Sequence, residues 1–142
     1  MKYIVLCFFF GLLFNEATAQ DFEKIIVNKN DSVAGYYLSV KPASGKIYGV
    51  LMLLDGFAGR PETIFPETKL PQVASENNIL TIAVGMGEKL YADSAVITKM
   101  NLIIKDVISR YKVPANKFII GGFSAGGTIS LRYVELCKES PS

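Results

Sequence analysis

The pattern of apolar and polar positions divides most of the chain into strands and helices. Five β-rich or apolar runs are candidate strands, at residues 22–28, 34–41, 47–54, 79–84 and 117–120. A polar turn cluster separates the first two runs, which predicts an antiparallel pair. The other three runs are almost continuously apolar, as expected for strands buried on both faces of a sheet.

Three segments with a helical spacing of apolar residues follow the later strands, at residues 68–78, 94–111 and 128–139. The middle one has the clearest stripe, made of Met100, Ile103, Ile104, Val107, Ile108 and Tyr111. Asp93 or Ser94 is placed to cap its start. A hairpin followed by the order β-α-β-α-β-α predicts an α/β domain, with a mostly parallel sheet and helices on both faces.

Between the last predicted strand and the last helix, residues 121–127 read Gly-Gly-Phe-Ser-Ala-Gly-Gly. A strand, a Gly-x-Ser-x-Gly turn and a helix together form the context of a nucleophile elbow, with Ser124 as the nucleophile. Gly122 and Gly126 lack side chains, which allows the strand and the helix to close around the serine. The helix N-terminus directs free N–H groups to the place where an oxyanion would form.

Phosphate-binding interpretations of this glycine-rich turn have less support in the sequence. Gly121 and Gly126 have the spacing of a P-loop, but Gly127 stands where the phosphate-binding lysine belongs. Phe123 occupies the second glycine of the dinucleotide-binding pattern. A simple Gly/Ser turn between a strand and a helix remains the alternative to a catalytic site.

The first residues are typical of an export signal. A short basic start, an apolar stretch at residues 4–14 and the small residues Ala17 and Ala19 precede Gln20. We interpret residues 1–19 as a signal peptide cleaved near Ala19–Gln20, which predicts a periplasmic or extracellular protein; its apolar core is too short to span a bilayer. A buried N-terminal helix is the alternative. Residues 20–142 are then one domain.

Charge and composition exclude several functions. The net charge is +2 and is spread evenly along the chain, which argues against nucleic acid or a membrane surface as a partner. After export only Cys137 remains, so no internal disulfide is expected, and we expect this cysteine to pack as a small apolar residue. With no histidine and no ligand spacing among the acids, we expect neither a metal nor a cofactor.

Three stretches together resemble a known family: residues 51–57, residues 111–114 and the elbow at residues 118–127. The chain resembles the N-terminal half of an α/β-hydrolase, nearest in pattern to secreted esterases of the esterase D and enterochelin-esterase type. The resemblance implies a small-molecule ester as substrate, an acyl-enzyme on Ser124, and oxyanion-hole N–H groups from Ala125 and from Phe57 or Gly56.

The chain departs from that family in one respect, because it contains no histidine. Family members place an acid and a histidine after the nucleophile. Here the acids after Ser124 are Glu135 and Glu139, on the helix that runs away from the serine. We therefore expect residues 20–142 to be the N-terminal part of a single hydrolase domain, incomplete after the elbow helix, with the strand at 117–120 as an open edge.

Two functions are compatible with these residues. The first is a secreted serine hydrolase that acts on carboxylic esters, or an acyltransferase that passes the same acyl group to an alcohol. The second is a non-catalytic α/β-hydrolase-like module that binds a ligand or a partner. A histidine in downstream sequence, or labelling of Ser124 by a fluorophosphonate, distinguishes them.

Overall fold

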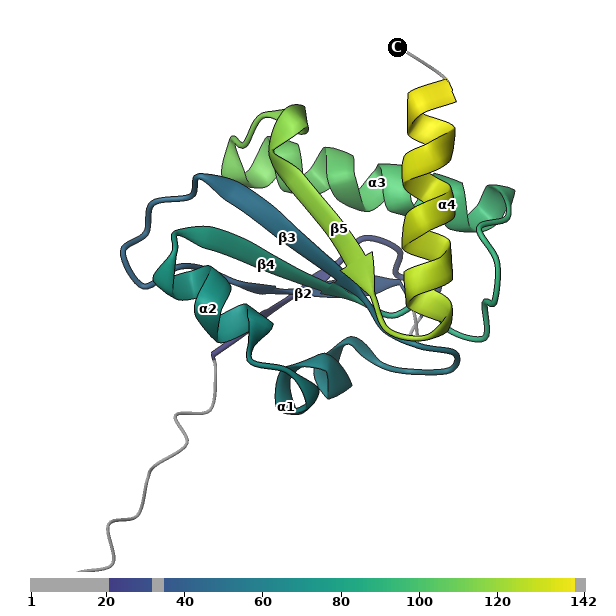
Figure 1. Cartoon of the computed structure of the whole chain (residues 1–142), viewed down its shortest axis with the longest axis horizontal. Coiled ribbons are helices and arrows are strands. Elements are labelled where there is room, and N and C mark those ends of the chain that lie inside the picture. Colours follow the sequence, from purple (N-terminus) through teal and green to yellow (C-terminus); the bar gives the residue numbers. More distant parts are fainter. Residues whose placement is uncertain (1–20, 32–34, 140–142) are drawn as a thin grey trace, which may run out of the picture.

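The computed structural model describes residues 21–31 and 35–139 and contains a five-stranded mixed sheet in the order β1-β2-β4-β3-β5 (Figure 1). The strands are β1 (Glu23–Ile26), β2 (Tyr36–Val40), β3 (Gly49–Leu54), β4 (Ile79–Val84) and β5 (Phe118–Gly122). β1 and β2 form the predicted antiparallel hairpin, and β2 also pairs antiparallel with β4. The parallel core is β4-β3-β5, so the predicted fold class is confirmed.

The apolar runs of β3 and β4 are buried because both faces of the sheet are covered. Met52 and Leu54 belong to the larger core cluster on one face, while Leu53, between them in sequence, belongs to a smaller cluster on the other. A strand alternates its side chains between the two faces, so both sets must be apolar when helices lie on both sides.

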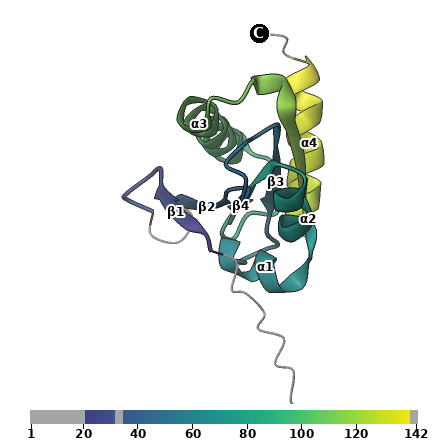
Figure 2. The same ribbon diagram turned by 90° about the vertical axis from the view of Figure 1, so that its left-hand side faces the viewer.

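The helices are α1 (Ile64–Glu67), α2 (Leu70–Glu76), α3 (Ser94–Tyr111) and α4 (Ala125–Glu139), with 3-10 turns at Pro61–Thr63 and Ala115–Lys117. Figure 2 shows α3 on one side of the sheet and α1 and α2 on the other. α3 has the predicted bounds, and the side chains of its apolar stripe lie in or against the larger core cluster. The cap is Asp93, whose carboxylate accepts a hydrogen bond of 2.8 Å from the Val96 N–H.

Some details differ from the sequence-based expectations. The first two strands are shorter than predicted, and α1 lies in a segment where no helix was predicted. α1 has only four residues and contains Pro66, so its sequence carries no helical period; its Ile64 is fully buried against the sheet. α4 starts at Ala125 instead of residue 128, which makes Gly126 and Gly127 helical.

The expectation for Cys137 is wrong, because this residue is exposed on α4. Burial and a hydrogen bond with Cys137 raise the pKa of the Tyr133 hydroxyl, one turn earlier. The last helix turns Tyr133, and not the cysteine, toward the core.

The open edge expected at the last strand is present in the described sheet. β5 pairs with β3 on one side, and the side chain of Ile119 is 64% exposed. Within the described ranges, no helix is long and apolar enough to cross a membrane. The predicted signal peptide lies outside the described residues.

Candidate active site

The loops that follow β3, β4 and β5 meet at one end of the sheet, where the parallel strands all have their carboxyl ends. Backbone hydrogen bonds tie these loops together. The Phe123 N–H donates to the Leu54 carbonyl at 3.0 Å, and the Ala58 N–H donates to the Gly87 carbonyl at 2.9 Å. The site therefore rests on rigid strand ends and on backbone contacts between the loops.

Ser124 lies between β5 and α4 in the left-handed region, at φ 49°. This conformation is unfavourable for a residue with a side chain, and it persists only where surrounding contacts impose it. The contacts include the carbonyl of Ser124, which accepts hydrogen bonds from the Gly127 and Thr128 N–H groups in the first turn of α4. A strained serine between a strand and a helix is the geometry of a nucleophile elbow.

The glycines that flank Ser124 are required by close backbone packing. A Cβ on Gly122 would lie 2.7 Å from the Leu54 carbonyl oxygen and 2.6 Å from the Gly126 carbonyl carbon. A Cβ on Gly126 would lie 2.4 Å from the carbonyl oxygen of Asp55 and 2.5 Å from that of Leu54. No real Cβ approaches backbone atoms so closely. Both positions therefore require glycine for the strand and the helix to close around Ser124, as the sequence predicted.

The loop after β3 reaches the serine. A Cβ on Gly56 would lie 3.6 Å from the Cβ of Ser124, so the two residues are in van der Waals range. The Gly56 N–H donates to the carboxylate of Asp55 at 2.7 Å. Phe57, the next residue, has a side chain that is 52% exposed. The sequence-predicted residues Gly56 and Phe57 thus lie in a loop that contacts the turn at Ser124, and Ala125 follows that turn as the first residue of α4.

Asp55 organises this loop, a role that the sequence-based search did not assign. Its side chain is buried, one carboxylate oxygen accepts the Gly56 N–H, and the other accepts the hydroxyl of Thr63. Gly59 closes over it, since a Cβ there would lie 2.4 Å from a carboxylate oxygen. The sequence does carry a signal for this role, because an acid stands directly after a buried strand and before two glycines. A buried carboxylate needs hydrogen-bond donors, and the backbone N–H groups of such a loop can supply them.

Of the two acids expected on the last helix, the structure describes the side chain of Glu135 only, and it does not face the serine site. Glu135 is exposed and pairs with Arg132 at 3.3 Å on the surface of α4. The side chain of Glu139 lies outside the described part of the structure. Over residues 21–31 and 35–139, no group of three His, Cys, Asp or Glu side chains is placed to hold a metal ion.

No protein-family model and no curated protein matches this chain. Among solved structures, it is similar to substrate-bound FphF, a fluorophosphonate-binding serine hydrolase of Staphylococcus aureus, with a TM-score of 0.59 and 18% sequence identity. The match covers 74% of this chain and 48% of FphF, so the chain spans about half the length of that hydrolase. The likeness concerns the fold and agrees with the α/β-hydrolase arrangement of the sheet.

Proposed function

We propose that this protein is a serine hydrolase that acts on carboxylic esters through an acyl-enzyme on Ser124. The observation that carries the proposal is the strained serine at φ 49°, held at the start of α4 beside the Gly56 loop. Backbone strain at a polar residue, in a loop cluster at the carboxyl ends of parallel strands, is typical of catalytic sites. The structural likeness to FphF supports the same class of chemistry.

In the proposed reaction, the Oγ of Ser124 attacks the ester carbonyl, the alcohol leaves, and water hydrolyses the acyl-enzyme. The Ala125 N–H, at the first residue of α4, is one oxyanion donor, and the helix dipole favours negative charge there. For the second donor we favour Phe57 over Gly56, because the Gly56 N–H already donates to Asp55. Each such donor is worth about 3–4 kcal/mol in the transition state.

The proposal includes an acid and a histidine from outside these 142 residues, because the chain contains no histidine. A serine hydroxyl without a general base is a weak nucleophile, and losing the base costs several powers of ten in rate. The same missing base favours the second candidate, a non-catalytic module that retains the elbow for packing. An acyltransferase would use the same acyl-enzyme with an alcohol as acceptor.

Labelling of the full-length protein with a fluorophosphonate probe tests the proposal. We expect the wild type to be labelled and to hydrolyse p-nitrophenyl acetate, and Ser124→Ala to lose both. Ser109→Ala, which removes an exposed serine from α3, is the matched control and should behave as wild type. An unlabelled, inactive wild type that is well folded would instead support the binding module.

We also propose that the protein is exported and acts in its mature form. The support is the signal-peptide pattern of residues 1–19. N-terminal sequencing of the secreted product should begin at Gln20, whereas a product that starts at Met1 would contradict export by cleavage.

A further inference from the structure

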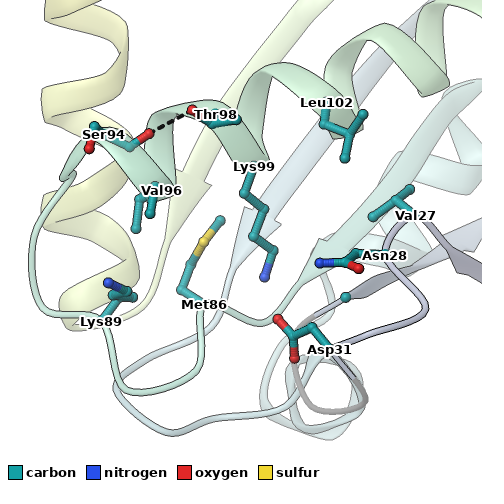
Figure 3. A pocket seen from close by; sticks show the side chains of 12 residues that line it. Val27, Asn28, Asp31, Met86, Lys89, Ser94, Val96, Thr98, Lys99 and Leu102 are labelled. Carbon is teal, nitrogen blue, oxygen red and sulfur yellow. Dashed lines mark hydrogen bonds between the residues drawn. The ribbon is translucent and has the colours of Figure 1, made fainter.

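A cavity of about 490 Å³ lies between α3, the β1–β2 connection and the loop after β4 (Figure 3). Part of its wall is apolar, formed by Val27, Met86, Val96 and Leu102. None of its lining residues belongs to the elbow or to the loop at residues 55–60. The cavity is therefore separate from the serine site, and its size and partly apolar wall suit a small organic molecule.

Lys99 extends from α3 into this cavity, and its amine points toward Asn28 and Asp31 (Figure 3). The side chain is half-buried, and its Nζ donates a hydrogen bond to the carbonyl of Gly85. That hydrogen bond holds the amine in place at the wall of the cavity. A lysine that is partly buried is less well solvated than a surface lysine, and an amine held in this position can react with a molecule bound in the cavity.

Two other charged side chains line the cavity. Asp31 comes from the β1–β2 connection, and Lys89 from the loop after β4, where it pairs with Asp93 at 2.7 Å. Burial lowers the pKa of the Lys99 amine to about 8, while the carboxylate of Asp31 acts in the opposite direction. At pH 8 about half of the Lys99 amines are uncharged and nucleophilic, whereas an ordinary lysine is almost fully protonated.

We propose that Lys99 and this cavity form a second site, which binds small neutral aldehydes with an apolar body as reversible imines. The amine nitrogen attacks the carbonyl carbon to form a carbinolamine. Loss of water from the carbinolamine then gives the imine: a C=N double bond replaces the C=O double bond, and the carbonyl oxygen leaves as water with the two protons that the amine nitrogen loses. The step needs no oxidant or reductant, and hydrolysis reverses it.

The chemistry of the wall selects the ligand class. The carboxylate of Asp31 offsets the positive charge of Lys99, and Asp93 pairs with Lys89, so the charges around the cavity balance and do not favour an anion. The apolar side chains of Val27, Met86 and Val96 favour an aryl or alkyl body. This site does not depend on the function proposed for Ser124.

The test is to incubate the full-length protein with benzaldehyde at pH 8, trap imines with borohydride, and map the modified lysines by mass spectrometry. Lys105, exposed on the same helix, is the internal control. We expect Lys99 to be labelled about tenfold faster than Lys105, because about half of the Lys99 amine is uncharged at this pH and the cavity holds the aldehyde beside it. The Lys99 rate should level off above about pH 8, where most of its amine is already uncharged.

Matched variants separate this site from general reactivity. Lys99→Met should lose the fast label, whereas Lys46→Met, at an exposed lysine outside the cavity, and Ser124→Ala should keep it. Glyoxylate, an anionic aldehyde without an apolar body, should show a smaller preference for Lys99 over Lys105 than benzaldehyde does, because it gains nothing from the apolar wall. Equal labelling of Lys99 and Lys105 by benzaldehyde in a folded wild type overturns the proposal, as does a preference for Lys99 that is as large with glyoxylate as with benzaldehyde.

Discussion

Gly56 and Ser124 face each other at the carboxyl end of the sheet, where a Cβ on Gly56 would lie 3.6 Å from the Cβ of Ser124. Pairing of β3 with β5 produces this contact, since Leu54 is opposite Gly122 in the parallel register. A change of one residue in that register would separate the two loops. The geometry of the candidate site therefore depends on the central strands as much as on the motif.

The glycines of the elbow differ sharply in how they tolerate a side chain. We expect Gly126→Ala to lower the free energy of unfolding by about 1–3 kcal/mol or more, because its Cβ would overlap the carbonyl oxygens of Asp55 and Leu54. Gly121→Ala is the control, since a Cβ there meets no atom within 4 Å. Urea unfolding of both variants measures the difference, and equal stability of the two would contradict this packing.

Replacing Asp55 should disorganise the loop after β3. Asp55→Ala leaves the Gly56 N–H without its acceptor and removes one of the two acceptors of the Thr63 hydroxyl, the other being the Arg60 carbonyl at 2.8 Å. We expect a loss of about 1–3 kcal/mol in the free energy of unfolding, together with loss of ester turnover in the full-length protein. Glu67→Ala, an exposed acid nearby on α1, should leave both unchanged. Wild-type turnover in Asp55→Ala would show that the loop does not need this carboxylate.

The buried hydroxyl of Tyr37 links the hairpin to α3. It donates to Asp106 at 2.6 Å, and Arg110 binds the same carboxylate. Burial disfavours the charge of Asp106, but the hydrogen bonds from Arg110 and Tyr37 dominate and lower its pKa. Tyr37→Phe should cost about 1–2 kcal/mol in thermal or urea unfolding. Tyr48→Phe, at a tyrosine 62% exposed, should change stability little; a Tyr37→Phe variant as stable as wild type would disprove the link.

Lys99 should make the stability of the fold depend on alkaline pH. Its pKa is about 8 in the folded protein and about 10.4 in an unfolded chain, so the unfolded state binds more protons between these values. The contribution of this group to the free energy of unfolding should thus rise with pH from about 8 to about 10. Urea titrations over that range should give a flatter profile for Lys99→Met. Parallel profiles would mean that the amine titrates normally.

The helices and strands whose apolar residues follow a clear pattern were predictable from the sequence. The bounds of α3 match the predicted helix because its apolar stripe and the Asp93 cap are local signals. β3 and β4 were predicted from their continuous apolar runs, because a strand that is buried on both faces needs apolar side chains at every position. α1 and the position of Cys137 were missed because short helices and single residues depend on what packs against them.

By itself, the sequence determined the order of the strands and of every helix except α1, the strand–turn–helix arrangement around Ser124, and the need for glycine at positions 122 and 126. These features depend on local spacing and on the space available to a backbone. Only the tertiary structure decided that β3 pairs with both β4 and β5, that the Gly56 loop reaches Ser124, and that Asp55 engages the Gly56 N–H. Such contacts join residues far apart in the chain, and they form only when the strands pair in register and bury their apolar faces.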